Sequence, residues 1–121
     1  MTDNELKDEA DSLRKAFGDT ASAREPNNVV LFRISQASLP MGCTPGRTPV
    51  LIRLQPGQER PEVFVKPGIT LPNGVAPRST SVVPIGGESW LQFSYTFPWD
   101  AKQHSLVQFV GAALLRFAKA D

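Results

Sequence analysis

The chain contains one cysteine, one histidine and no long apolar run, and each of these shortages excludes a class of protein. A lone cysteine, Cys43, excludes an internal disulfide and any metal site built from several cysteine ligands. We expect no metal and no cofactor. No apolar run reaches the roughly 20 residues of a membrane span, and the first residues, MTDNELKDEA, are acidic where a signal peptide is basic. We therefore expect a cytoplasmic protein.

A surplus of positive charge is also missing. Thirteen Lys and Arg residues stand against 12 Asp and Glu residues, which gives a formal net charge of +1. Proteins that bind nucleic acids or acidic membranes normally have a basic surplus or a basic cluster. The composition therefore predicts that neither a nucleic acid nor a membrane is the partner. With 121 residues, the sequence has the length of one domain that buries its own core, and we predict a single domain over residues 1–121.

The most strongly patterned stretch is residues 86–117, which contains both tryptophans. Its C-terminal part predicts a helix whose apolar residues recur every three or four positions. These residues are Leu106, Phe109, Val110, Ala113, Leu114 and Phe117. Asp100 is a suitable N-cap for this helix, and Gln103 would complete a capping box. We expect the helix to be the main anchor of the core.

A second amphipathic helix is predicted over residues 3–17. Either Thr2 with Glu5 or Asp3 alone suits its N-terminal cap, and Gly18 suits its end. Strands are predicted at residues 29–35, 50–54, 63–65 and 90–94, with a further short strand at 81–83. Residues 19–28 and 36–49 read as connections, and most of 69–84 reads as an irregular surface crossing that is mobile relative to the sheet. Strands between terminal helices indicate an α+β fold, with helices on one face of an antiparallel β-meander.

Few residues suggest chemistry. Cys43 could act as a nucleophile, since a thiol in an exposed loop near Arg47 would have a lowered pKa, but an ordinary loop thiol is the simpler interpretation. His104 falls in the first turn of the predicted helix, where a surface role suits it better than catalysis. Asp100 and Glu88 could form an acid/base pair, although capping already accounts for Asp100.

Two regions are candidates for binding another protein. The first is the aromatic turn formed by Tyr95, Phe97 and Trp99, because exposed aromatic residues often dominate binding energy. The second is the loop that joins Met41 to Arg47, which combines an apolar side chain with a guanidinium group.

The order of elements and several short motifs resemble those of prokaryotic ubiquitin-conjugating-enzyme-like proteins. The motifs are LPMG (39–42), VLIRLQPG (50–57), RPEVFVKPG (60–68), LPNGVAP (71–77) and SWLQFS (89–94). The match covers residues 29–117, and the N-terminal helix fits by its order alone. The resemblance implies a ubiquitin-conjugating-enzyme-like fold and a role beside bacterial ubiquitin-like modifiers.

The sequence lacks the catalytic cysteine of an active conjugating enzyme. Such enzymes carry the modifier as a thioester on a cysteine in the crossing after the meander, and no cysteine lies between Lys66 and Trp99. The resemblance therefore implies a noncatalytic binding or scaffold subunit. Its partners would be a ubiquitin-like modifier, an activating enzyme or a catalytic conjugating enzyme. Two alternatives remain open: an active enzyme that carries the modifier on Cys43, and a small α+β adaptor with an unrelated partner.

Overall fold

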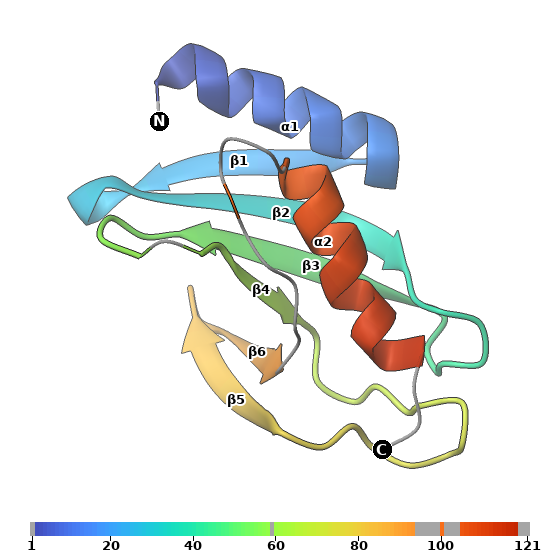
Figure 1. Cartoon of the computed structure of the whole chain (residues 1–121). Coiled ribbons are helices and arrows are strands. Elements are labelled where there is room, and N and C mark those ends of the chain that lie inside the picture. Colours follow the sequence, from blue (N-terminus) through green and yellow to red (C-terminus); the bar gives the residue numbers. More distant parts are fainter. Residues whose placement is uncertain (1, 59, 94–99, 101–104, 119–121) are drawn as a thin grey trace.

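Two helices lie near the ends of the chain and six strands lie between them (Figure 1). The computed structural model describes residues 2–58, 60–93, 100 and 105–118. In chain order the elements are α1 (Asp3–Phe17), β1 (Thr20–Glu25), the short 3₁₀ turn η1 (Pro26–Asn28), β2 (Val29–Ser38), β3 (Arg47–Leu54), β4 (Glu62–Val65), β5 (Thr80–Ile85), β6 (Glu88–Phe93), α2 (Leu106–Leu114) and the 3₁₀ turn η2 (Leu115–Ala118). The predicted α+β class is confirmed.

Helix α1 begins and ends where the sequence predicts. The Thr2 hydroxyl accepts from the Glu5 amide, and the Glu5 carboxylate accepts from the Thr2 amide, so that two amides at the helix start have partners. Gly18 ends the helix with a φ of 92°, a conformation that residues with a Cβ rarely adopt. Ala10 and Leu13 are buried and direct the helix onto the sheet.

All six strands form one antiparallel sheet with the order β1-β2-β3-β4-β6-β5. Strands β1 to β4 make a meander, and the hairpin β5–β6 joins it through β6. Gly86 and Gly87 form the two-residue turn of this hairpin, and both have positive φ (61° and 80°). A tight hairpin turn with positive φ at both central residues twists in the same sense as its strands, which explains the two glycines.

The prediction that residues 19–28 are only a connection is wrong. Six of them form β1, which pairs with β2 from Thr20 opposite Ile34 to Glu25 opposite Val29. Its sequence, TASARE, contains one β-branched residue and no alternation of apolar and polar residues. Every residue after Thr20 is exposed. Backbone pairing at the edge of the sheet, and not side-chain burial, forms this strand.

Both helices lie on the same face of the sheet (Figure 1). Between them and the sheet lies the larger hydrophobic cluster, which includes Leu13, Phe32, Ile52, Phe93 and Phe109. Phe93 packs on Phe117 with ring centroids 4.7 Å apart. The apolar face predicted for the last helix is buried at all six positions, so this part of the prediction is confirmed. No helix of the described residues lies over the opposite face of the sheet, and we call it the open face.

The start of the last helix differs from the prediction. Helix α2 begins at Leu106 and is capped by Ser105, whose hydroxyl accepts from the Gln108 amide. The Gln108 side chain accepts in turn from the Ser105 amide. Asp100 is exposed and does not cap α2. A Ser-x-x-Gln motif competes with the Asp-x-x-Gln motif five residues earlier, and the structure uses the one adjacent to the apolar residues.

The crossing after β4 is irregular but is not confined to the surface. Ile69 and Leu71 are buried in the larger cluster, whereas most of residues 72–84 are exposed, as the sequence predicts. Thr70 exchanges two backbone hydrogen bonds with Thr44, with N···O distances of 2.7 and 2.9 Å. The first half of the crossing is thus fixed to the rest of the molecule. The predicted mobility of the crossing stays a prediction.

Truncating the centre of α2 should destabilise the whole domain. Phe109 projects from α2 and is fully buried. Phe109→Ala therefore loses the free energy of transferring the phenyl ring out of water and also leaves a cavity. We expect a loss of about 3–5 kcal/mol in the free energy of unfolding, measured by urea denaturation. Gln108→Ala alters the neighbouring exposed position and should cost about 1 kcal/mol through the lost cap. An unmoved midpoint in Phe109→Ala would contradict the role assigned to this helix.

Candidate functional site

The loop between β2 and β3 carries the most exposed large apolar residue of the described chain. Met41 is 97% exposed at the tip of this loop. The loop is closed at its base by a hydrogen bond from the Leu39 amide to the Gly46 carbonyl, at 2.9 Å. Arg47, the other residue predicted to bind, is exposed at the first position of β3. The structure therefore places Met41 and Arg47 on one loop.

Several contacts hold this loop in place although its tip is exposed. The Cys43 amide donates to the Pro40 carbonyl at 3.2 Å and forms a tight turn under Met41. Thr44 pairs with Thr70 of the crossing. Gly42 approaches the crossing so closely that an added Cβ would lie 2.9 Å from the Pro72 Cβ. Met41 is thus an exposed apolar side chain on a fixed backbone.

Cys43 lies in this loop but faces inward. It is buried, and its thiol donates to the carbonyl of Phe117 with an S···O distance of 3.2 Å. Burial raises the pKa of the Cys43 thiol, because the thiolate loses its hydration. The expectation of an exposed thiol with a lowered pKa beside Arg47 is therefore wrong. A shielded thiol with a raised pKa is a poor nucleophile.

Two further exposed apolar residues come from segments at the same end of the molecule. Val75 lies in the crossing that Gly42 touches, and Leu115 begins η2, which contacts Cys43 through Phe117. The ends of these segments lie beside one another in Figure 1. We call the loop surface that carries Met41 and Arg47 the loop end. An exposed apolar residue on the same loop as an exposed guanidinium group is a composition suited to contact with another protein.

The open face contains a second, smaller hydrophobic cluster. Leu51, Phe64 and Trp90 form its buried centre, with Leu31, Val83 and Ile85 packed around them. Trp90 is only 1% exposed although no helix covers it. Trp90 lies on the opposite face of β6 from Phe93, which packs under the last helix.

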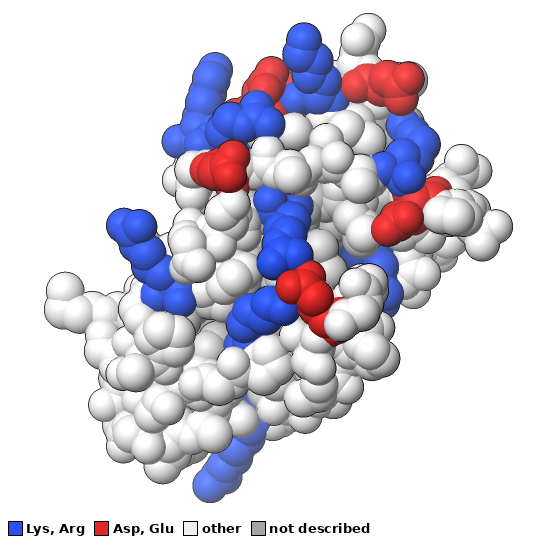
Figure 2. Space-filling model, turned by 180° about the vertical axis from the view of Figure 1, so that it is seen from behind, with Lys and Arg blue, Asp and Glu red and all other residues white. Residues whose placement is uncertain are grey.

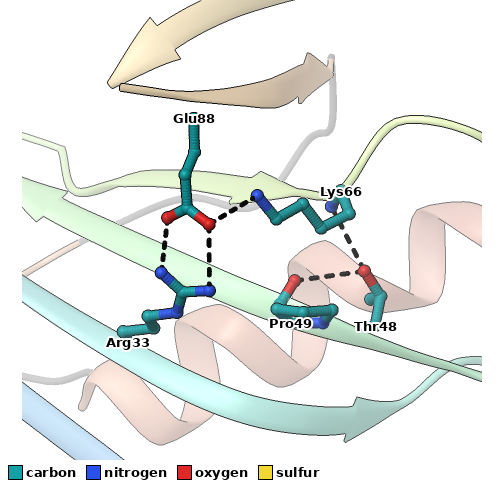
Figure 3. A network of polar contacts seen from close by, with 5 residues as sticks. All are labelled: Arg33, Thr48, Pro49, Lys66 and Glu88. Carbon is teal, nitrogen blue, oxygen red and sulfur yellow. Dashed lines mark hydrogen bonds and ion pairs between the residues drawn. The ribbon is translucent and has the colours of Figure 1, made fainter. Parts of the chain in front are cut away.

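Charged side chains, and not a helix, shield Trp90 from water. The Arg33 guanidinium carbon lies 5.3 Å from the Trp90 ring centroid, and the Lys66 Nζ lies 4.2 Å from it. Glu88 accepts from both cations: from Arg33 at 2.5 and 3.3 Å and from Lys66 at 3.2 Å (Figure 3). The hydrogen bond from Arg33 is the main reason that the pKa of Glu88 lies below its ordinary value. Glu88 therefore has a structural partner on each side and is not paired with Asp100 for catalysis.

A second ion pair shields Phe64. Arg53 donates from Nε and Nη2 to the two carboxylate oxygens of Glu62, at 2.8 and 3.0 Å, and its guanidinium carbon lies 5.2 Å from the Phe64 ring centroid. Gln55 also donates to Glu62. Seen from behind, charged residues of both signs cross the middle of the molecule, and its lower part has few of them (Figure 2). The open face is thus an apolar cluster under a layer of paired charges.

The remaining predicted residues cannot be placed. Tyr95, Phe97, Trp99 and His104 lie outside the described residues, and the aromatic turn stays a prediction. Within the described ranges, no group of three or more His, Cys, Asp or Glu side chains could hold a metal ion. No helix in the same part of the chain has the length and apolarity needed to cross a membrane.

Comparison with known proteins identifies no relative. Neither a protein-family model, nor a curated protein, nor a solved structure matches the chain. The function must therefore be argued from the residues themselves.

The burial of Cys43 predicts slow chemical modification. In the native protein at pH 8, a maleimide should react with Cys43 at least about tenfold more slowly than in urea, because the thiol is shielded and its pKa is raised. The measurement is mass spectrometry of samples quenched over time. Equal rates in the two states would show that the thiol is accessible and would restore its candidacy as a nucleophile.

The Arg53–Glu62 pair predicts a pH-dependent contribution to stability. Its hydrogen bond from Arg53 lowers the pKa of Glu62 below the ordinary value of 4.5, so the folded state prefers the charged carboxylate. This contribution is fully present above that ordinary value and is lost as the pH falls through the lowered pKa. Glu62→Gln should therefore be less stable than the native sequence at pH 7, by about 1 kcal/mol for a partly exposed pair. The difference should shrink toward acid pH in urea titrations, and a difference that is constant from pH 7 to pH 3 would contradict the assignment.

Proposed function

We propose that this chain is a noncatalytic protein-binding domain that acts as a binding or scaffold subunit in a bacterial ubiquitin-like conjugation system. The proposal rests on two arguments of different kind. The resemblance to prokaryotic ubiquitin-conjugating-enzyme-like proteins suggests the pathway. The fixed, exposed Met41 at the loop end carries the binding role.

Met41 supports this role because exposure and rigidity occur together. An apolar side chain that is 97% exposed contributes nothing to the core, whereas the backbone that carries it is held by Pro40, Thr70 and Pro72. A fixed backbone reduces the conformational entropy that is lost on binding, and methionine adapts its shape to the partner surface. Arg47 at the same loop adds a group that can bind a carboxylate of the partner with two hydrogen bonds.

The buried thiol weighs against the catalytic alternative. A thioester on Cys43 would require the sulfur to leave its contact with Phe117 and reach solvent. We therefore place the chemistry of the pathway in a partner. The candidate partners are the ubiquitin-like modifier, the activating enzyme and a catalytic conjugating enzyme.

Substitutions at the loop end should weaken partner binding without unfolding the domain. Met41→Ala and Arg47→Ala change exposed side chains and should leave the melting curve unchanged. Against the modifier, activating enzyme and conjugating enzyme encoded at the same locus, we expect each variant to lose more than about 1 kcal/mol of binding free energy in calorimetry. Val82→Ala removes an equally apolar exposed side chain from β5 and serves as the matched control.

The same components separate the three hypotheses. Wild-type affinity in both loop variants would remove the loop end from the proposal, and absence of binding to every component would leave the unrelated adaptor. Incubation with activating enzyme, ATP and modifier tests the remaining alternative. A thiol-labile adduct on Cys43, detected by mass spectrometry, would overturn the noncatalytic assignment.

A further inference from the structure

The two edges of the sheet are protected unequally. Ile85 and Glu88 flank the two-residue turn of the β5–β6 hairpin and form a hydrogen-bonded pair, so Pro84, one residue earlier, directs its backbone away from β6. Proline has no N–H group, and the outer edge of β5 therefore lacks a donor near its C-terminal end. Natural edge strands are commonly protected from pairing in this way. Strand β1 contains no proline, no lysine and no bulge.

The outward backbone groups of β1 follow from its pairing with β2. The Ser35 amide donates to the Asp19 carbonyl at 2.9 Å, which makes Asp19 and Ser35 a hydrogen-bonded pair. In an antiparallel ladder these pairs alternate, so Thr20, Ser22 and Arg24 direct their backbone groups away from β2. The Thr20 carbonyl accepts from Arg14 at 2.8 Å, as expected for an outward group. Among the described residues, none bonds to the backbone of Ser22, which is exposed.

A hollow lies beside this edge on the open face. Its volume is about 260 Å³, and its lining is mostly apolar, with the Arg33–Glu88 pair and Ser22 as its polar members. The other lining residues are Ala21, Ala23, Leu31, Leu51, Ile85, Gly86 and Trp90. Small-molecule sites normally start at about 300 Å³ and enclose most of the ligand. This hollow is smaller and open to one side, and its walls are apolar. It has the size and character of a site for one large apolar side chain.

A strand that pairs with the outer edge of β1 would have a register that brings some of its side chains to the hollow. In an antiparallel strand added outside β1, the residue opposite Ser22 would exchange two backbone hydrogen bonds with it. The residues on either side would lie opposite Ala21 and Ala23, with their side chains on the open face. Because alanine is small, a large side chain at either position can pass over β1 and enter the hollow. A single extended segment would then form hydrogen bonds with the outward backbone groups of β1 and fill the hollow with one of its side chains.

We propose that β1 accepts an extended segment of a partner protein as a seventh strand of the sheet. The segment places large apolar side chains at the two positions that flank the residue opposite Ser22. Main-chain hydrogen bonds supply affinity in this mode of recognition, and the pocket for alternate side chains supplies specificity. The site goes beyond the proposed function, since it uses different residues from the loop end and does not depend on the conjugation pathway.

Self-pairing fits the hollow less well than a partner segment does. If two copies paired through β1, outward residues would face outward residues, and the register that pairs all three of them places the two-fold axis between the Ser22 residues. Ala21 of one copy would then lie opposite Ala23 of the other. Four alanines would border the two hollows, and no side chain would fill them. A partner segment with large apolar residues buries this surface, and a second copy does not.

The experiment selects binders from a phage-displayed library of random nine-residue peptides. The matched pair of variants is Ser22→Pro, which removes the outward N–H group without removing a hydrogen bond to β2, and Ser22→Ala, which keeps that group and removes only the hydroxyl. A third variant, Ala21→Leu, fills the hollow. We expect enriched peptides to carry large apolar residues two positions apart. Their affinity should be unchanged in Ser22→Ala and at least about tenfold weaker in Ser22→Pro and Ala21→Leu, with unchanged melting curves as the condition for comparison.

Amide hydrogen exchange gives a second readout on the native sequence. An enriched peptide should slow exchange of the Ser22 amide about tenfold or more, because this amide becomes a donor to the peptide. Failure to enrich any peptide over Ser22→Pro would overturn the proposal, as would enriched peptides that bind without protecting Ser22. Protection in the protein alone that grows with its concentration would assign the edge to a second copy, and would likewise overturn the assignment to a partner.

Discussion

A six-stranded sheet with helices on one face has to exclude water from its other face with side chains alone. Here the sheet buries Leu51, Phe64 and Trp90 on the open face, and the cover consists of the long side chains of Arg33, Arg53 and Lys66. Arginine and lysine cover aromatic rings with their aliphatic stems while their charges stay in water. Glu62 and Glu88 hold these cations in position. In the part of the chain that the structure describes, charged side chains thus cover the buried centre of the open face.

Two surfaces of this small domain, the loop end and the β1 edge, are the ones to which we assign binding by proposal. Most of the core is completed without the exposed side chains of these two surfaces. Met41 is fixed from below by the crossing, and β1 is fixed from one side by β2. In each case the neighbouring segments hold the backbone in place, while the Met41 side chain or the outer backbone groups of β1 stay exposed. Rigid exposed groups lose little entropy on binding, so both surfaces suit recognition better than catalysis.

The sequence predicted the elements that are formed by side-chain burial. The α1 cap, the apolar face of α2 and the central strands all follow from patterns of apolar residues and caps, and these predictions are confirmed. Strand β1 was missed because its formation depends on backbone pairing with β2. The start of α2 was misplaced because two capping motifs compete, at Asp100 and at Ser105.

The candidate site was predicted only in part. Exposure of Met41 follows from a turn-rich loop, but the inward orientation of Cys43 depends on a contact with Phe117, 74 residues away. The charged cover of Trp90 was missed for a similar reason, since Arg33, Lys66 and Glu88 lie in separate segments. The alternation of Leu31 with Arg33, and of Leu51 with Arg53, was the available signal that this face mixes apolar and charged residues. Local patterns carry no information about which distant segments meet.

The pairing between β4 and β6, which we call the seam, is short, and this affects which part of the sheet can open first. Only two residue pairs, Phe64 with Gln92 and Val65 with Leu91, join the hairpin to the meander in register. Beyond this seam the hairpin is held by the contacts of Glu88 with Arg33 and Lys66 and by the packing of Phe93 on Phe117. We expect the β5–β6 hairpin to open as one unit while β1 to β4 stay paired, an opening that would expose Trp90, Leu91 and Phe93. Such an opening would release the wall of the hollow formed by Ile85 and Trp90, and would couple the shape of that recognition site to the local stability of the hairpin.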